Sequence, residues 1–302
     1  MTRSVLLVAH TGRASTSEAA RRVVRRLQAA GVEVRVLADE ASDIGLTGIR
    51  RCDAAGAASG AELVLVLGGD GSILRSAELA REACVPLLGV NLGRVGFLAA
   101  AEVEDLDDVV GRVLDRDYGV EERLTLDVSV HAEGAEEVQG WALNEASVEK
   151  AARERMLELV IEIDGRPLSR WGCDGVVAAT PTGSTAYAFS GGGPVVWPTV
   201  EALTLVPISA HALFARPLVI APTSTIALEV LPSGAQAVLN CDGRRTRAVP
   251  HGARVELRRG AVPVLLARVR DTPFPDTLVR KFGLPVQGWR GAAEHRGDAA
   301  AG

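Results

Sequence analysis

The stretch LVLVLGGDGSILR, residues 63–75, combines five apolar residues, a glycine-rich turn and the beginning of a helical pattern. This order is typical of a buried strand whose following turn presents backbone N–H groups to a phosphate. Asp70 lies in the middle of the turn, however, and no lysine accompanies it there. A carboxylate placed where an anion is expected to bind needs a chemical explanation.

The sequence around this stretch alternates between strand and helix patterns. The predicted elements are strands at residues 4–10, 32–38, 61–69 and 85–91, and helices at 17–31, 72–83 and 104–117. Short apolar strands separated by helices are typical of a parallel sheet with crossover helices. We therefore predict an α/β domain at residues 1–120.

The pattern changes near residue 121. From there to residue 271 the chain offers many short β-rich segments, which turn residues separate, and little periodicity of helix length. This arrangement predicts a β-rich, sandwich-like domain at residues 121–271. A short helix is expected within residues 272–285, and residues 291–302 are predicted to be disordered.

The composition excludes several classes of protein. The 302 residues suffice for two domains, and 33 Lys and Arg against 38 Asp and Glu leave a net charge of −5, which argues against a nucleic-acid partner. No apolar run reaches the length of a membrane span, so no membrane partner is expected. The cysteines are few and widely spaced, and the five histidines show no metal or triad spacing. We therefore predict a cytoplasmic protein without a metal site formed by its own side chains.

Three interpretations of the Gly68–Ser72 turn compete. It is a tight turn in which Asp70 or Ser72 caps the helix, or a simple phosphate cradle, although the spacing and lysine of a P-loop are absent. In the third, a nucleotide's phosphates approach the glycines while Asp70 accepts a proton from an attacking hydroxyl or helps to hold Mg²⁺. Arg75 is placed to reach a phosphate, but it also fits a solvated helix surface.

A second group of polar residues follows another predicted strand. In GVVAATPTGSTAYAFSGGGP, residues 175–194, serine and threonine beside glycine offer hydroxyls and free amides to a polar ligand. Tyr187 in this segment is suited to stack on a base or to bond it. Asn144 and Glu145 interrupt a strand-like segment and can bond ribose hydroxyls or base edges. In each case a plain turn is the alternative, and Asp174 has the same ambiguity.

With these motifs in view, the chain resembles the NAD kinase family over residues 1 to about 290. The glycine-aspartate loop by itself is not specific, because phosphofructokinases and diacylglycerol-type lipid kinases carry similar loops. The long TPTGSTAY segment is specific. The motifs that carry the resemblance are GGDGSILR (68–75), NLGRVGFLA (91–99), LNE (143–145), DGVVAATPTGSTAYAFSGGGP (174–194), HALFARPLVI (211–220) and NCDGR (240–244).

The resemblance implies transfer of the γ-phosphoryl group of ATP, with Mg²⁺, to the 2′-hydroxyl of the adenosine ribose of NAD. It also implies a nucleotide-binding α/β domain, which residues 272–290 rejoin through the final helix, a β-rich NAD-binding domain, and a homodimer or homotetramer. Asp70 is then the catalytic proton acceptor. The implied ligand-binding residues are Gly71, Arg75, Asn144, Glu145, Arg155, Asp174, Thr185, Ala186, Tyr187, Ala188, Phe189, Ser190 and Arg244.

The sequence also has to be weighed against alternative functions. A kinase for a sugar phosphate needs a basic cluster that the loops do not offer, and a lipid kinase needs a basic or apolar surface that the net charge of −5 disfavours. A non-catalytic NAD-binding sensor would have no need for Asp70. The sequence leaves open whether polyphosphate replaces ATP, whether NADH is accepted, and whether NADPH inhibits.

Overall fold

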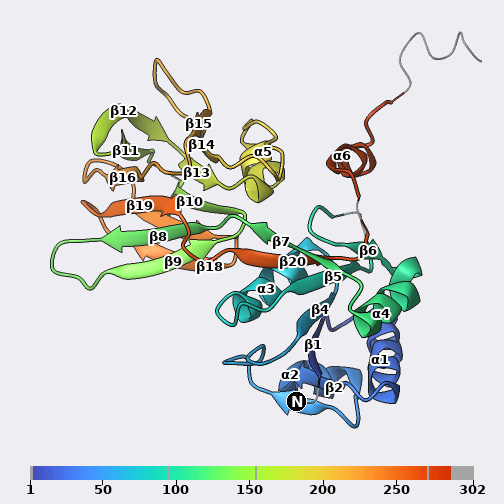
Figure 1. Ribbon diagram of the computed structural model, residues 1–302. Coiled ribbons are helices and arrows are strands. Elements are labelled where there is room, and N and C mark those ends of the chain that lie inside the picture. The colour runs from blue at the N-terminus through green and yellow to red at the C-terminus, as the bar shows by residue number, and fades with distance from the viewer. Residues whose placement is uncertain (1–2, 94–95, 154, 271, 287–302) are drawn as a thin grey trace, which may run out of the picture.

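Seven strands of the N-terminal part and one late strand form an eight-stranded sheet (Figure 1). The computed structural model describes residues 3–93, 96–153, 155–270 and 272–286. Neighbouring strands pair in parallel except for the last pair, which is antiparallel. In spatial order the strands are β3 (Arg50–Cys52), β2 (Glu33–Leu37), β1 (Ser4–Ala9), β4 (Leu63–Leu67), β5 (Leu87–Asn91), β20 (Val264–Arg268) and β7 (Gly119–Arg123), while β6 (Ala101–Glu102) pairs with β5.

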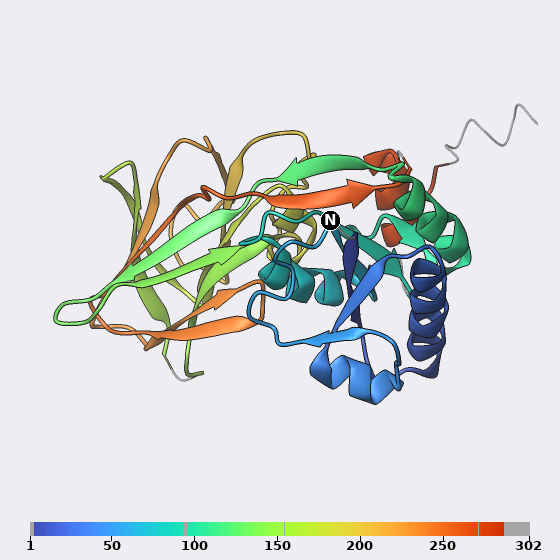
Figure 2. The ribbon, with the colours of Figure 1, turned by 60° about the horizontal axis from the view of Figure 1, so that its bottom comes forward.

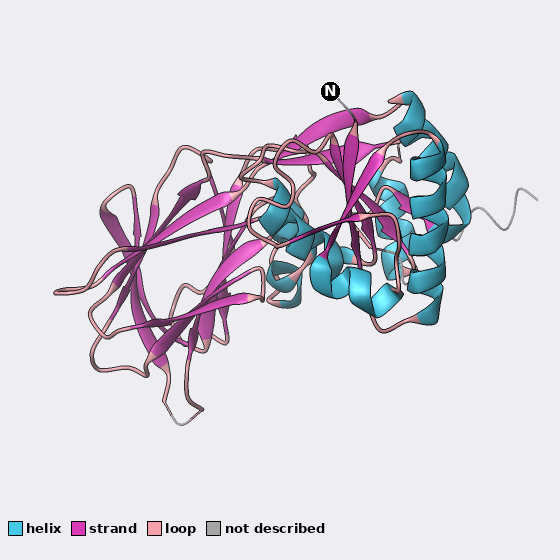
Figure 3. Cartoon of the chain, turned by 90° about the horizontal axis from the view of Figure 1, so that it is seen from below, coloured by secondary structure: helices cyan, strands magenta, loops and turns pink. Residues whose placement is uncertain are grey.

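Helices cover both faces of this sheet, as Figure 3 shows. Side chains alternate along the buried strands, so that Leu7 packs on one face and Leu6 on the other. The first face packs against α1, α2 and α4, and the second against α3. The helices are α1 (Ala14–Ala29), α2 (Ala38–Ile44), α3 (Asp70–Ala80) and α4 (Leu106–Asp115), with a 3-10 turn η1 (Val103–Asp105) before α4.

The second part consists of two six-stranded antiparallel sheets that share one apolar core. Trp171 is fully buried in this core. The predicted α/β domain and β-rich, sandwich-like domain are therefore both confirmed. One sheet contains β15 (Leu218–Ile220), β14 (Leu203–Ile208), β13 (Gly175–Ala179), β10 (Glu145–Lys150), β17 (Ala237–Cys241) and β18 (Arg245–Val249); the other contains β12 (Arg166–Cys173), β11 (Leu157–Ile163), β16 (Ile226–Val230), β19 (Arg254–Arg259), β8 (Leu126–His131) and β9 (Val138–Ala142).

Two antiparallel strands, β7 and β20, lie where the chain passes between the two parts (Figure 2). β20 lies within the predicted β-rich range, 121–271, but it pairs with β5 in the first sheet. Its four consecutive apolar residues fit either sheet, so its partner depends on tertiary structure. The predicted domain boundaries remain predictions.

The last helix, α6 (Phe274–Phe282), packs through aromatic rings rather than through fully buried side chains. The Phe97 ring lies 6.1 Å from that of Phe274 and 5.8 Å from that of Phe282. Phe282 also stacks on Phe189 of the β-rich part, at 4.8 Å between ring centroids. The predicted return of the final helix is thus confirmed. The predicted disordered tail, 291–302, lies outside the described residues, and within them no helix is long and apolar enough to span a membrane.

Candidate functional site

The turn between β4 and α3 places Asp70 at the first position of the helix. Gly69 is the N-cap residue, and no side chain caps this helix. The Asp70 carboxylate instead accepts two backbone hydrogen bonds, from the N–H of Phe97 at 3.0 Å and from the N–H of Leu98 at 3.1 Å. The structure therefore does not support the interpretation of Asp70 as a helix cap.

Gly96 allows this close approach. A Cβ atom at position 96 would lie only 2.2 Å from Oδ1 of Asp70. Any larger residue would push the carboxylate or the loop aside. Residues 96–99 lie at the end of the NLGRVGFLA motif (91–99), and no role for them is predicted from the sequence.

Arg75 lies further along α3 and has a partner within the protein. Its guanidinium forms an ion pair with Oε1 of Glu40 at 2.8 Å. Glu40 is buried and also accepts the N–H of Ala9 at 2.9 Å, while burial raises the pKa of its carboxyl group. A contact between Arg75 and phosphate remains a prediction. Gly71, the other predicted binding residue of this turn, is exposed at the start of the helix.

The second predicted segment leaves β13 and packs directly against Asn144. Thr180 donates its hydroxyl to the carbonyl of Leu143 at 2.6 Å, and its N–H to the carbonyl of Asn144 at 2.9 Å. A Cβ at Gly183 would lie 2.0 Å from the backbone oxygen of Asn144. The 3-10 turn η2 (Thr182–Thr185) and the short helix α5 (Tyr187–Ser190) follow. Two segments that the sequence identified separately are thus brought together.

Glu145 and Asp242 form a buried acidic pair next to Asn144. They are 7% and 6% exposed, and Asp242 accepts the N–H groups of Leu143 and Asn144 at 3.0 and 2.7 Å. Burial, and then the charge of Asp242, raise the pKa of Glu145 to about 7, although the N–H of Tyr187 bonds its carboxylate at 3.4 Å. Burial likewise raises the pKa of Asp242. Asp242 was missed from the sequence, although the quoted NCDGR motif contained it.

The remaining predicted residues differ in their surroundings. The Tyr187 hydroxyl donates to Glu149 at 3.3 Å, and Asp174 pairs with Lys150 at 2.5 Å. Arg155 is exposed and makes no hydrogen bond or ion pair with the residues that the structure describes. The others lie on η2 and α5 or between them: Thr185 and Ala186 are partly buried, Ala188 is buried, and Phe189 and Ser190 are exposed.

A cavity of about 1280 Å³ connects these segments. Gly96, Phe97 and Leu98, which surround the Asp70 carboxylate, line one part of it, and Thr182 and Thr185 line another. Residues of α6 complete the wall. The cavity exceeds the size usual for one small ligand and borders both the 96–98 loop and the Thr182–Thr185 turn.

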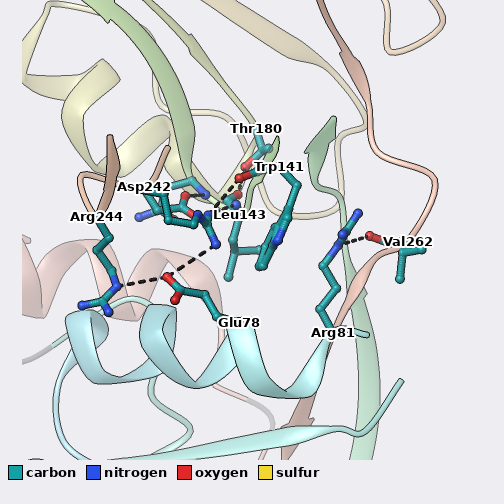
Figure 4. Close-up of polar contacts among 10 residues, drawn as sticks. Glu78, Arg81, Trp141, Leu143, Thr180, Asp242, Arg244 and Val262 are labelled. Atoms are coloured by element: carbon teal, nitrogen blue, oxygen red, sulfur yellow. Dashed lines mark hydrogen bonds and ion pairs between the residues drawn. The ribbon is translucent and has the colours of Figure 1, made fainter. Parts of the chain in front are cut away.

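Polar contacts join α3 to the β-rich part of the chain (Figure 4). Glu78 of α3 accepts Nε of Arg244 at 3.1 Å and lies 3.4 Å from Nη1 of Arg245. The guanidinium groups of Arg245 and Arg81 lie over the Trp141 ring, at 4.3 and 4.6 Å from its centroid. Arg244, predicted to bind ligand, is thus engaged at the junction between the two parts. Ligand binding by Arg244 stays a prediction.

The described residues contain no group of three or more His, Cys, Asp and Glu side chains that could hold a metal ion. All four cysteines are free thiols, and burial raises the pKa of both Cys173 and Cys241 to about 12.

Two family models and several curated relatives match this chain. Residues 5–118 match the ATP-NAD kinase N-terminal domain, and residues 143–269 match the ATP-NAD kinase C-terminal domain. An NAD kinase of Thermobifida fusca (strain YX) is 61% identical over 97% of this chain and 93% of its own length. NAD kinase 2 of Streptomyces coelicolor is also 61% identical, over 96% and 97% of the two chains.

Solved structures resemble the fold over nearly the whole chain. Yeast NADH kinase, complexed with NADH, has a TM-score of 0.86 over 95% of this chain and 89% of its own, at 24% identity, and shows the fold alone. An NAD kinase from Archaeoglobus fulgidus, in complex with ATP, has a TM-score of 0.68 over 94% of this chain and 100% of its own, at 25% identity.

Proposed function

The chain belongs to the ATP-NAD kinase family, and on this premise we propose that it transfers the γ-phosphoryl group of ATP to the 2′-hydroxyl of the adenosine ribose of NAD. The observation that carries this proposal is the cavity that touches both the loop around Asp70 and the Thr182–Thr185 turn. A phosphoryl donor and a dinucleotide have to meet in one place, and this cavity borders both motifs.

Asp70 is the proton acceptor in this proposal. Phosphoryl transfer depends mainly on positioning and on neutralisation of charge, but a ribose hydroxyl is a weak acid that must lose its proton as the new bond forms. The N–H groups of Phe97 and Leu98 fix the carboxylate in one orientation, as a general base requires. Mg²⁺ arrives with ATP as part of that substrate and neutralises phosphate charge.

The residues near Asn144 hold the NAD in this proposal. Asn144 has a side-chain amide without a hydrogen-bond partner among the described residues, so it is free to bond a ribose or a base edge. With its pKa raised to about 7, Glu145 can present both a donor and an acceptor near neutral pH. Gly71, Arg75, Arg155, Asp174, Arg244 and residues 185–190 are proposed to complete the binding surfaces.

The test is formation of NADP from NAD and Mg-ATP by the purified chain and by Asp70→Asn. We expect kcat to fall by about 10²–10⁴-fold in the variant, while NAD still binds, because only the proton acceptor is lost. Asp39→Asn, an exposed aspartate at the start of α2, is the matched control and keeps full activity.

Equal kcat values for Asp70→Asn and the wild type would remove Asp70 from the chemistry. A folded wild type that binds NAD but forms no NADP would leave a sensor, or a different donor, as the function. Repeating the assay with inorganic polyphosphate separates these two outcomes and decides between the donors. Size-exclusion chromatography with light scattering tests the proposed homodimer or homotetramer.

A further inference from the structure

Arg268, the last residue of β20, contacts the loop that holds Asp70. Its Nη1 donates to the carbonyl oxygens of Leu98 and Ala99, at 3.0 and 3.1 Å. Leu98 also donates its N–H to Asp70 at 3.1 Å. Leu98 therefore donates its N–H to the Asp70 carboxylate, and its carbonyl oxygen accepts a hydrogen bond from the Arg268 guanidinium.

The two carbonyl groups have few other partners. Within the described part of the chain, no backbone N–H donates to the oxygen of Leu98 or Ala99. The loop belongs to no helix or strand, so no ladder of backbone hydrogen bonds fixes it. Arg268 gives these two carbonyl groups the hydrogen-bond donor that regular secondary structure supplies elsewhere.

Arg268 is itself firmly held. Its Nε donates at 2.6 Å to Glu121 of β7, which also accepts Nη2 of Arg123 at 2.6 Å. The Arg268 side chain is only 22% exposed. Burial lowers its pKa, while the charge of Glu121 and, more weakly, that of Asp70 raise it. A partly buried cation in this setting is costly to displace, because moving it would break hydrogen bonds to three acceptors at once.

We infer that Arg268 is a positioning residue, which holds residues 96–99 so that the N–H groups of Phe97 and Leu98 aim the Asp70 carboxylate at the substrate hydroxyl. Arg268 also lines the cavity, and the effect inferred here passes through the loop that it bonds. The inference rests on the proposed role of Asp70 as proton acceptor. Loss of the guanidinium frees the loop, and displacement of a reacting group by about 1 Å can lower the rate on the order of 10²-fold.

The test is a double-mutant cycle in kcat with Arg268→Met, Asp70→Asn and the double variant. We expect Arg268→Met to lower kcat on the order of 10²-fold while KM for NAD changes only a few-fold, because positioning of the base affects the transition state and not NAD binding. The double variant is expected to be no slower than Asp70→Asn alone, since a residue that acts through Asp70 has nothing left to position.

The chain offers a closely matched control in Arg3. Its guanidinium donates to the carbonyls of Leu114 and Val113 at 2.7 and 2.8 Å and pairs with Glu62 at 2.7 Å. Arg3→Met thus removes the same number of carbonyl contacts and an ion pair with a glutamate, away from the Asp70 loop. We expect it to lose stability but to keep kcat, so that the comparison separates positioning from general destabilisation.

Two results would overturn the inference. One is a folded Arg268→Met variant with the kcat of Arg3→Met, and the other is a double variant whose loss is the product of the two single losses. If Asp70→Asn is fully active, the proposed function fails instead, and the inference falls with it.

Arg268→Lys serves if Arg268→Met does not fold, because an ammonium group keeps the charge and some donors. We expect Arg268→Lys to lower kcat in the wild-type background, where the carboxylate is present, and to leave kcat unchanged in the Asp70→Asn background. An equal loss in both backgrounds would also overturn the inference.

Discussion

Replacement of Glu145 by glutamine removes a buried carboxyl group whose pKa the fold raises from 4.5 to about 7. Desolvation is the largest cause of this rise, and the charge of Asp242 is the second. The N–H of Tyr187 bonds the Glu145 carboxylate, but at 3.4 Å this contact is too long to compensate. Glu145→Gln keeps the shape of the side chain and removes its titration.

The raised pKa makes a definite prediction for stability. In the unfolded chain Glu145 loses its proton near pH 4.5, whereas in the folded protein it keeps the proton up to about pH 7. Between these values the folded state binds about one more proton, so the free energy of unfolding falls by about 1.4 kcal/mol for each pH unit that is gained. Over the whole range from pH 4.5 to about 7, the free energy of unfolding falls by about 3 kcal/mol. Below and above this range, the contribution of Glu145 to stability does not change with pH.

Urea unfolding of the wild type and of Glu145→Gln, at several pH values between about 5 and 8, measures this effect. We expect the stability of the wild type relative to the variant to decline as the pH rises and to level off above about pH 7. Glu122→Gln, an exposed glutamate on β7, is the control and should follow the wild type at every pH. A constant difference between the wild type and Glu145→Gln across the window would refute the reasoning.

Three further predictions concern close contacts. Gly96→Ala is expected to lower kcat on the order of 10²-fold, since the added methyl group would lie 2.2 Å from the Asp70 carboxylate oxygen, and steady-state kinetics on a folded variant checks this. Gly183→Ala is expected to cost about 3 kcal/mol of stability or more in urea unfolding, because its Cβ would meet a backbone oxygen at 2.0 Å; Gly119→Ala, with no atom within 4 Å, is the neutral control. Trp141→Leu should cost about 2 kcal/mol, because the two arginines over its ring lose their aromatic partner, and unchanged urea unfolding would contradict this.

Much of the fold is visible in local patterns. The apolar run at 63–67 predicted a buried strand, and β4 occupies those residues with every side chain buried. Glycines then predicted a turn into a helix, and α3 begins at Asp70. The many short segments after residue 121 likewise predicted antiparallel β-structure, which both six-stranded sheets confirm. These features depend on neighbours along the chain, so periodicity and turn residues are enough to predict them.

The details of the candidate site depend on residues far apart in sequence. Arg268 and Leu98, which share a hydrogen bond, are separated by 170 positions. Asp242 lies beside Asn144 across 98 positions, and nothing local distinguishes it from an aspartate in an ordinary turn. Nothing in the sequence predicts an ion-pair partner for Arg75 or Arg244, yet in the fold each pairs with a glutamate.

The sequence by itself thus determined the two kinds of domain, the glycine turn with its carboxylate and the second hydroxyl-rich turn. Only the tertiary structure decided which groups surround them. The partners of a side chain depend on strand order and on the path between domains. β20 illustrates this, because its run of apolar residues suits either sheet. Its pairing with β5 carries Arg268 to the Asp70 loop. Long-range pairing, which no short pattern encodes, therefore determines how the carboxylate is held.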